Sequence, residues 1–424
     1  MSVSPATSQD ESAPAKPARS RFGPNHRWTV LGIGCAAQAS FSASFSGIPV
    51  TGTTMRADYH LTNGTLGIVL GSISLGIAAS EILWGIWTDR FGERRVLLTG
   101  LIATGVVLAL MGVAVVPSGG SVPHPALLVI GLLLVGAFGG SVNGSSGRAV
   151  MAWFREGQRG FAMSIRQTAV PAGGAIGTAV LPWLAVTYGF RVVFIVLALL
   201  CFLAAGATAI WLHQPQDHAP AGGAAGAPAP VAGPSPLRRW DIWRMALSGG
   251  MLTVPQIAVL AAAGVYLHDA KHAGLGVIVP TVLVAQVGGA AARIWSGRYT
   301  DKHGNRRRVI RIIGLLTGVV MAAAAILTSA PTLVVAAALA LAGLLANAWH
   351  GVAYTEIASM AGANRAGTAL GLENTTVFTG AFLTPMLVPV VEHAFSWTVV
   401  WAIIAVIPLA AVLLSPGAVR TARS

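Results

Sequence analysis

The chain has 424 residues, of which 54% are hydrophobic and only 10% are charged, and its formal net charge is +13. Soluble domains carry about a quarter of their residues as Asp, Glu, Lys or Arg, so this composition excludes a soluble globular protein. It also excludes disorder over most of the length, because so apolar a chain must bury its surface. The 27 basic residues fall in short clusters between apolar runs. That pattern is typical of the loops of a membrane protein and not of a nucleic-acid-binding surface.

The predicted elements begin after a polar tail. Residues 1–26 are rich in Ser, Ala and Pro and lack the apolar core of a signal peptide, so we expect a disordered cytoplasmic tail. From Trp28 onward we expect twelve transmembrane helices, because each apolar stretch has the roughly 20 residues that cross a bilayer core about 30 Å thick. The predicted spans cover residues 28–50, 65–87, 96–117, 126–148, 161–184, 190–212, 243–267, 275–297, 309–329, 332–354, 367–390 and 395–415. The fold class is therefore an all-α membrane protein.

The basic residues predict the orientation. They crowd the N-terminal tail and the loops after the even-numbered spans, whereas the opposite loops hold only Arg56, Arg191 and Lys271. By the positive-inside rule, both termini are expected in the cytoplasm. A Pro-, Ala- and Gly-rich stretch between spans six and seven predicts a cytoplasmic linker. The expected organisation is a tail (1–26), a six-helix bundle (27–212), a linker (213–240), a second six-helix bundle (241–415) and a tail (416–424).

An internal repeat supports the division into two halves. "GIWTDRFGERR" begins at Gly85 and "GRYTDKHGNRR" begins at Gly297, 212 residues later, and each copy follows the second helix of its half. The carboxylates Asp89 and Asp301 can cap or salt-bridge a helix end. The bases Arg90 and Lys302 that follow them anchor the loops at the membrane surface. We therefore expect these two loops to be gating elements.

The two loops resemble the signature of the major facilitator superfamily, Gly-x-x-x-Asp-Arg/Lys-x-Gly-Arg/Lys-Arg/Lys, and the resemblance covers residues 28–415. It implies two pseudo-symmetric six-helix bundles and loop charges that hold one access state and release it in the other. The chain departs from the signature at Glu93 and Asn305, where the family usually has a base. Within the superfamily, "WFREGQRGFAMSIRQT" and "ARIWSGRYTD" look most like bacterial permeases of small organic anions, including monocarboxylate transporters.

Four charged residues lie inside the predicted spans, where ionisable side chains are costly and therefore candidates for function. They are Glu81, Arg166, Arg293 and Glu373. Each is seven or eight residues from a basic or acidic loop residue, which places it about 10–12 Å from the cytoplasmic loops at 1.5 Å per residue. The four residues are expected to form one layer.

The family resemblance also implies which helices are neighbours. It places helix 2 beside helix 11 and helix 5 beside helix 8, so Glu81 is expected near Glu373 and Arg166 near Arg293. Two carboxylates in a low dielectric cannot both stay ionised, so one is expected to carry the coupling proton. Two guanidinium groups offer planar, bidentate donors to a substrate carboxylate. In the alternative hypothesis the four charges pair with one another as a cytoplasmic gate and bind nothing.

Other polar residues outline a possible cavity. The expected substrate-binding residues, besides the two arginines, are Gln38, Gln256, Gln286, Asn347 and Tyr354. Gln38 shares one face of helix 1 with Ser42 and Ser46, although serine is also common where membrane helices pack. His350 is the alternative proton carrier because its charge can change near neutral pH. The competing interpretation is that it is a hydrogen-bonded packing residue.

We therefore expect a secondary transporter that moves a small organic anion, a monocarboxylate in the first instance, with a proton by alternating access. The alternatives are a proton-coupled exporter of amphiphilic drugs or metabolites and a transporter-like sensor. The chain carries no nucleotide-binding loop, metalloprotease motif or nucleophile elbow, so an enzyme, a cofactor and a metal are not expected. The expected partners are the anion, the proton and the lipid of the plasma (inner) membrane, with a monomeric protein and no nucleic acid.

Overall fold

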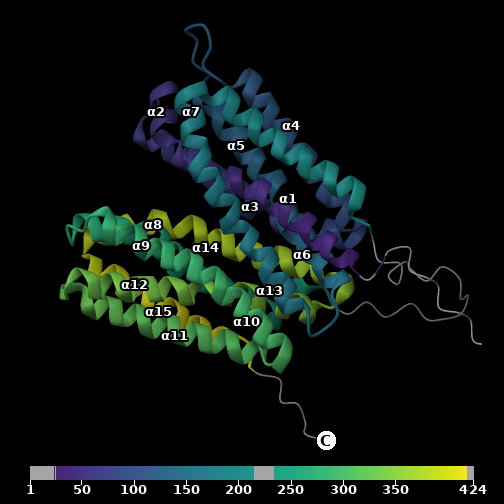
Figure 1. The fold of residues 1–424 in the computed structure, drawn as a ribbon, viewed down its shortest axis with the longest axis vertical. Helices are drawn as coiled ribbons and strands as arrows, with labels where there is room; N and C mark the ends of the chain where they lie inside the picture. The colour runs from purple at the N-terminus through teal and green to yellow at the C-terminus, as the bar shows by residue number, and fades with distance from the viewer. Residues whose placement is uncertain (1–22, 24, 214–233, 418–424) are drawn as a thin grey trace, which may run out of the picture.

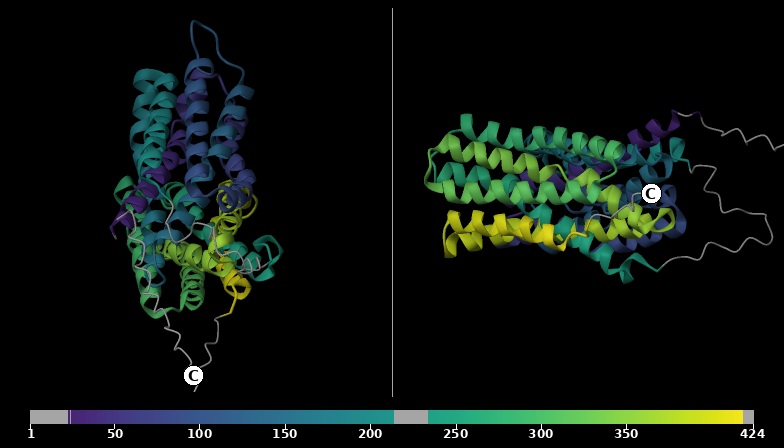
Figure 2. Two further views of the ribbon diagram at one scale, coloured as in Figure 1. Left: turned by 90° about the vertical axis from the view of Figure 1, so that its right-hand side faces the viewer. Right: turned by 90° about the horizontal axis from the view of Figure 1, so that it is seen from below.

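The computed structural model describes residue 23 and residues 25–213 and 234–417. Within these ranges the chain is helical, and its one β-bridge joins Ser118 to Ser121 in a loop. The helices form two bundles that lie side by side (Figures 1 and 2). Most of the predicted tails and of the predicted linker lies outside the described residues.

The N-terminal bundle comprises α1 (His26–Val50), α2 (Gly52–Asp58), α3 (Asn63–Phe91), α4 (Glu93–Ala114), α5 (Pro125–Gly139), α6 (Ser141–Trp153) and α7 (Arg159–Trp211). The C-terminal bundle comprises α8 (Trp240–Asp269), α9 (Leu275–Leu283), η3 (Val284–Gly288), α10 (Gly289–His303), α11 (Arg306–Ile326), α12 (Thr332–Asn347), α13 (His350–Ala361), α14 (Ala366–Ala394) and α15 (Trp397–Leu414). Short 3₁₀ turns lie at Pro236–Arg238, Leu327–Ser329 and Ala363–Arg365.

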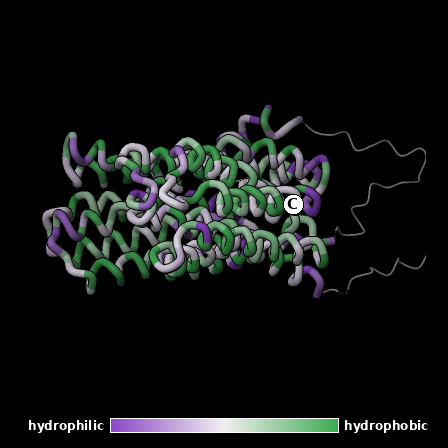
Figure 3. The backbone as a smooth tube through the Cα atoms, turned by 90° about the horizontal axis from the view of Figure 1, so that it is seen from above, coloured by the Kyte–Doolittle hydropathy of each residue, from purple (hydrophilic) through white to green (hydrophobic). Residues whose placement is uncertain are grey.

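The prediction of twelve spans is confirmed for the described residues. Ten helical stretches are long and apolar enough to cross a membrane. One of them, α7, contains two spans, because Gly189 (φ 76°, ψ 175°) reverses the chain in a conformation that favours glycine. The 25-residue α1 supplies the twelfth span. Hydrophobic residues dominate the lengths of the helices, and hydrophilic residues gather toward their ends (Figure 3).

Three of the predicted spans are not regular helices. Span four is divided at Gly140 into α5 and α6, and span ten is divided at Ala348 and Trp349 into α12 and α13. Span eight contains η3, a five-residue π-helical turn. Such interruptions leave backbone carbonyl groups without a partner inside the helix, so they must find donors elsewhere. Hydrophobic patterning alone does not reveal them.

The two bundles are joined at one end, which we call the motif end because it carries Asp89 and Asp301. A buried apolar cluster crosses between the bundles there, with Phe154 and Met163 from one side and Ile242 and Leu370 from the other among its members. Away from the motif end the two bundles diverge (Figure 1). In that direction the core of the C-terminal bundle continues by itself, and the core of the N-terminal bundle includes one residue of the other bundle, Phe378.

Two close helix crossings bring the bundles together, and they confirm the expected neighbours of helices 2 and 5. In one, α3 crosses α14; a Cβ atom on Gly367 would lie 2.7 Å from the carbonyl oxygen of Gly85. In the other, α10 crosses α7; a Cβ atom on Gly160 would lie 2.7 Å from the carbonyl oxygen of Gly297. Only glycine fits at such distances, so the repeated Gly85 and Gly297 are where the opposite backbones meet.

Candidate functional site

Asp89, in the first repeat loop, caps a helix of the opposite bundle. Its carboxylate accepts hydrogen bonds from the backbone N–H groups of Gly367 (2.8 Å) and Thr368 (2.7 Å) and from the hydroxyl of Thr368 (2.6 Å). These N–H groups belong to the first turn of α14, where no partner exists inside the helix and a negative charge is favoured. Arg148 lies 3.4 Å from Asp89 and 2.5 Å from Glu93. Glu93, which stands where the family signature usually has a base, is therefore paired with an arginine.

Asp301, in the second repeat loop, makes the reciprocal contact. It accepts hydrogen bonds from the backbone N–H groups of Gly160 (2.8 Å) and Phe161 (2.7 Å) in the first turn of α7. Arg306 lies 3.7 Å from Asp301 and reaches Glu156 of the N-terminal bundle at 2.5 Å. Each bundle therefore uses its repeat carboxylate to cap a helix of the other, and both caps lie at the motif end.

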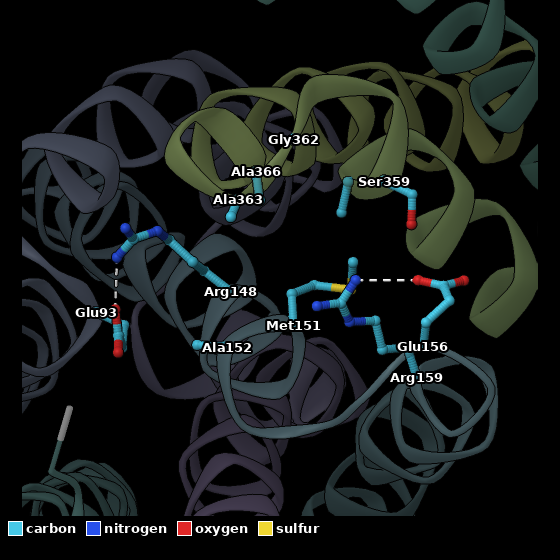
Figure 4. A pocket seen from close by; sticks show the side chains of 11 residues that line it. Glu93, Arg148, Met151, Ala152, Glu156, Arg159, Ser359, Gly362, Ala363 and Ala366 are labelled. Atoms are coloured by element: carbon cyan, nitrogen blue, oxygen red, sulfur yellow. Dashed lines mark hydrogen bonds and ion pairs between the residues drawn. The ribbon is translucent and has the colours of Figure 1, made fainter. Parts of the chain in front are cut away.

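A cavity of about 200 Å³ lies between the bundles at the motif end (Figure 4). Its charged lining residues are paired: Arg148 with Glu93, and Arg159 with Glu156 at 3.0 Å. The other predicted gating residues, Arg90 and Lys302, are exposed. Among the described residues neither base makes a hydrogen bond or ion pair with the opposite bundle, so at these two positions the carboxylates provide the polar contacts between the bundles.

The N-terminal bundle holds a closed cluster of polar side chains. Arg166 donates to Ser146 (2.9 Å), to the side-chain oxygen of Gln38 (2.6 Å) and to the carbonyl oxygen of Asn143 (2.6 Å), just beyond the break between α5 and α6. The side-chain amide of Asn143 donates to Glu81. All five residues are buried. The cluster thus joins two predicted charges through Asn143, which the sequence analysis did not identify.

The C-terminal bundle repeats part of this arrangement around Arg293. Its Nε donates to the carbonyl oxygen of Asn347 (2.9 Å), which the end of α12 leaves free, and one terminal nitrogen donates to the Asn347 side chain (2.5 Å). The other terminal nitrogen donates to the carbonyl oxygen of Gln167 in the opposite bundle (3.0 Å). A guanidinium has five N–H donors, so two of those of Arg293 have no partner among the described residues.

The structure does not bring the like charges together as expected, because the helices are rotated so that these side chains face other neighbours. On α14, Gly371 faces Glu81 of α3, whereas Glu373 points to Gly249 of α8. Consecutive helical residues are about 100° apart, so a position at the correct level can still face a different neighbour. The same applies to Arg166, because the group that reaches Arg293 is the backbone of the next residue, Gln167. Among the described residues, no hydrogen bond joins the side chains of either expected pair.

A central cavity of about 150 Å³ lies between the bundles, with walls from both. Of the predicted site residues it is lined by Gln256, Gln286, Arg293, His350 and Tyr354. Ser46, on the polar face expected for helix 1, also lines it, and the sequence analysis missed the other polar lining residues, which are Asn143, Gln167, Thr253 and Asn374. Its apolar wall includes Phe45 and Phe378, one from each bundle, in an edge-to-face contact at 5.5 Å.

The predicted residues outside this lining support it from behind. Gln38 and Asn347 hold the two arginines, and Arg166 and both glutamates are fully buried. Within the lining, His350 stacks on Trp349 with ring centroids 4.0 Å apart, and Tyr354 donates to Asn374 at 2.6 Å. Arg293 is thus the one arginine among the described residues that reaches the central cavity.

Comparisons with known proteins agree with this architecture. A model of the Major Facilitator Superfamily matches residues 33–385 and, in a second match, 282–422. An uncharacterised MFS-type transporter of Mycobacterium tuberculosis, Rv2994, is 29% identical over 401 residues, which cover 94% of this chain and 86% of that protein. The probable sulfoacetate transporter SauU of Cupriavidus necator is 31% identical over 171 residues, which cover 40% of this chain and 38% of its own.

Solved structures show the same fold at low identity. The structure of the proton:xylose symporter XylE, bound to a bromodeoxyglucose, superimposes with a TM-score of 0.70 at 15% identity and covers 93% of this chain and 97% of its own. Together with the family match, the twelve spans and the two bundles, this similarity leads to one assignment. The chain belongs to the Major Facilitator Superfamily and is an integral membrane transporter, not an enzyme.

Proposed function

We propose that this protein carries a small organic anion, a monocarboxylate in the first instance, across the membrane together with a proton. The observation that carries the proposal is Arg293, a cation in the central cavity with two N–H donors left for a ligand. The carboxamides of Gln256 and Gln286 in the same lining can bind the rest of a polar acid. SauU, a relative over 40% of the chain, is named for an organic anion, which supports the same class of substrate.

The proposed orientation follows from the loop charges. The motif end carries most of the basic residues, so it faces the cytoplasm of the inner membrane, with both termini on that side. The bundles are sealed there and diverge toward the other end, so this conformation is outward-facing (Figure 1). For the substrate to leave inward, the caps formed by Asp89 and Asp301 must break as the bundles, residues 27–212 and 241–415, rock about the cavity. We propose that one monomer contains the complete pathway.

The proposed proton carriers are buried in the charged layer. Glu81 and Glu373 have side chains that are fully shielded from solvent, and a carboxylate at such a site gains from taking up a proton. His350, the alternative, lines the same cavity as Arg293, whose positive charge opposes protonation of the ring. We therefore favour the carboxyl groups over the histidine.

The test is uptake into proteoliposomes. Lactate, glucuronate and sulfoacetate would be supplied as radiolabelled probes, with and without an imposed pH gradient. We expect saturable uptake of at least one acid, driven uphill by external acid and lost in Arg293→Gln at equal reconstitution. If none of the acids is taken up, the proposed substrate class is wrong. Binding without flux would favour a sensor.

A second candidate, export of amphiphilic compounds, has one specific observation in its favour. A crevice between α8, α14 and α15 has an almost wholly aliphatic lining, which includes Val254, Leu387 and Ile407. Such a surface can take an apolar chain from the membrane. Proton-driven efflux of a cationic dye that persists in Arg293→Gln would support this alternative.

A further inference from the structure

Most polar side chains in the lining of the central cavity are already hydrogen-bonded within the protein. Arg293 differs from them, because it keeps two N–H donors for a ligand. The largest neutral polar groups that remain are the carboxamides of Gln256 and Gln286. The side chains that are already bound are Asn143 (to Glu81), Thr253 (to the carbonyl oxygen of Gly249, 3.0 Å), Tyr354 (to Asn374, 2.6 Å) and His350 (Nδ1 to the carbonyl oxygen of Asn347, 3.3 Å). The cavity therefore offers a ligand one cation and few free neutral polar groups.

The apolar part of the lining contains an aromatic corner. Phe45 and Phe378 meet edge to face, with ring centroids 5.5 Å apart and ring planes at 90°. A third flat ring can lie against the face of one of two perpendicular rings and meet the other with its edge, and both arrangements are favourable. The same lining includes the aliphatic side chains of Val170, Ile257 and Leu260. These side chains can bind an apolar ring but give a hydroxyl group no partner.

The volume of the cavity fits one ring. It is about 150 Å³, and an apolar cavity of that volume lined by Leu, Ile and Phe holds benzene. Counted along the helices from the two capped ends, Arg293 is eight residues from Asp301 and Phe378 is eleven from Gly367. At 1.5 Å per residue, Phe378 is then roughly 4 to 5 Å further from the motif end than Arg293. A small acid can therefore contact the guanidinium and the aromatic corner at the same time.

We propose that the preferred substrate is an aromatic monocarboxylate of the size of benzoate, with its carboxylate on Arg293 and its ring in the corner formed by Phe45 and Phe378. This inference rests on the proposed function, because it names the class of anion that the same cavity carries. Arg293 is the only arginine or lysine in the described lining, so a second carboxylate would have no such partner. One hydroxyl on the ring could bond to Gln256 or Gln286.

Other small acids lack part of this match. Lactate can reach Arg293 but leaves the aromatic corner empty, so it forgoes the apolar contact. Glucuronate would place hydroxyl groups against the aliphatic side chains, where they lose water without gaining a partner. Cyclohexanecarboxylate is close to benzoate in size and equal in charge, but its ring has no π-face. Arg293 therefore binds every one of these anions, and Phe45 and Phe378 select among them.

The first test measures binding to the purified protein in detergent by isothermal titration calorimetry. The probes are benzoate, cyclohexanecarboxylate, lactate and glucuronate at neutral pH, where all four are ionised. Phe45→Leu and Phe378→Leu each remove a ring but keep an apolar side chain. The matched controls are Phe41→Leu and Phe382→Leu, which lie one helical turn away on α1 and α14 and outside the cavity lining.

We expect the parent protein to bind benzoate at least about threefold more tightly than cyclohexanecarboxylate and at least about tenfold more tightly than lactate or glucuronate. In Phe45→Leu and Phe378→Leu the first ratio should approach one, whereas in both controls it should stay within about twofold of the parent value. Arg293→Gln should lose binding of all four acids. A parent that binds benzoate no better than cyclohexanecarboxylate, or controls that lose the preference as the site variants do, would overturn the inference.

The second test needs no variant. Unlabelled benzoate and unlabelled lactate compete for exchange of a radiolabelled acid in proteoliposomes without a pH gradient, so that diffusion of neutral benzoic acid cannot collapse a driving force. We expect benzoate to inhibit at a concentration at least about tenfold lower than lactate. If the parent accumulates lactate, glucuronate or sulfoacetate but benzoate neither binds nor competes, the inference is wrong and the transport function stands. If benzoate binds with the expected preference but no acid is accumulated, the transport function is wrong and the ligand class stands.

Discussion

In each bundle a buried charged side chain bonds an asparagine beside a helix break, but the charge and its other partners differ between the two bundles. Glu81 and Arg293 occupy equivalent positions 212 residues apart, and each bonds the side chain of an asparagine beside a helix break, Asn143 or Asn347. In the N-terminal bundle the cluster closes, because Arg166 binds the backbone of the same asparagine. In the C-terminal bundle Arg293 binds both the backbone and the side chain of Asn347, and neither carboxyl oxygen of Glu373 has a hydrogen-bond partner among the described residues.

This difference shows that the two halves of a duplicated fold can use similar buried polar groups in different roles. A buried charge surrounded by partners is part of the structure, because removing any member leaves the others uncompensated. A buried charge with free donors, or with no partner, can exchange a ligand or a proton at a smaller structural cost. The N-terminal cluster is of the first kind and the C-terminal residues are of the second.

The largest expected effect is on stability, in the N-terminal bundle. Arg166→Met removes hydrogen bonds to Ser146, Gln38 and Asn143 and leaves Glu81 without its nearby cation, so we expect the free energy of unfolding to fall by about 3 kcal/mol. Thermal denaturation in detergent measures it. Arg293→Met is the matched control and should lose less, because its guanidinium borders the central cavity. Equal losses would remove the distinction between the two bundles.

The next effect is on the substrate, in the C-terminal bundle. Arg293→Lys keeps the charge but loses the planar fork, so we expect uptake of the anion to fall at least tenfold, which corresponds to about 1.4 kcal/mol. Initial rates over a range of anion concentrations would show whether the loss lies in binding. Arg166→Lys should reduce the amount of folded protein without changing the apparent affinity of what remains. An unchanged affinity in Arg293→Lys would exclude this arginine from the site.

The sequence predicted which helices carry the four charges but not how the charges pair. Each charge lies in its expected helix, α3, α7, α10 or α14, and their common depth stays a prediction that follows from counting residues from a loop. The direction in which a side chain points depends on the rotation of its helix, and the glycines indicate that rotation. Gly367 and Gly371 lie on the face of α14 that packs against α3, so Glu373 faces α8 instead. The short series Gly-x-x-x-Gly before Glu373 was the available signal.

The breaks in spans four and ten could not be predicted in the same way. Gly140 lies in a glycine-rich stretch that gives a weak indication, and "NAWH" around Trp349 offers only Asn347, a weaker helix-ending signal than glycine. These breaks depend on a donor from another helix: the indole N–H of Trp84 binds the carbonyl oxygen of Ala137 in span four, and Arg293 binds that of Asn347 in span ten. A contact made through tertiary structure leaves no local pattern, which is why Asn143 was missed.

The two repeat loops provide a third comparison, with smaller expected effects. Asp89 accepts three hydrogen bonds from α14 and lies 3.4 Å from Arg148, whereas Asp301 accepts two from α7 and lies 3.7 Å from Arg306. We expect Asp89→Asn to weaken the seal by about 1 kcal/mol and Asp301→Asn by less. Transport should slow more than binding weakens in both variants.

The measurement for these variants is the labelling of a cysteine introduced at Ser359, which lines the cavity at the motif end. A weaker seal should raise its accessibility from that side, more in Asp89→Asn than in Asp301→Asn. The parent with its two native cysteines, Cys35 and Cys201, gives the background. Identical labelling and unchanged uptake in both variants would show that the caps do not control access.

The smallest effect concerns pH and the pair between Glu156 and Arg306, which crosses the two bundles. Partial burial alone would raise the pKa of Glu156, but the guanidinium groups of Arg306 and Arg159 outweigh it and hold this pKa below its usual value. A lowered pKa means that the pair stabilises the sealed state above the ordinary pKa of a glutamate and that this contribution is lost as the pH falls through the lowered value. Because the Glu156 side chain is 63% exposed, the contribution is small.

We therefore expect labelling at Ser359→Cys to rise slightly in acid. Glu156→Gln should label at the higher rate already at neutral pH and lose that part of the pH dependence, and an unchanged pH profile in this variant would assign the acid sensitivity to the two aspartate caps.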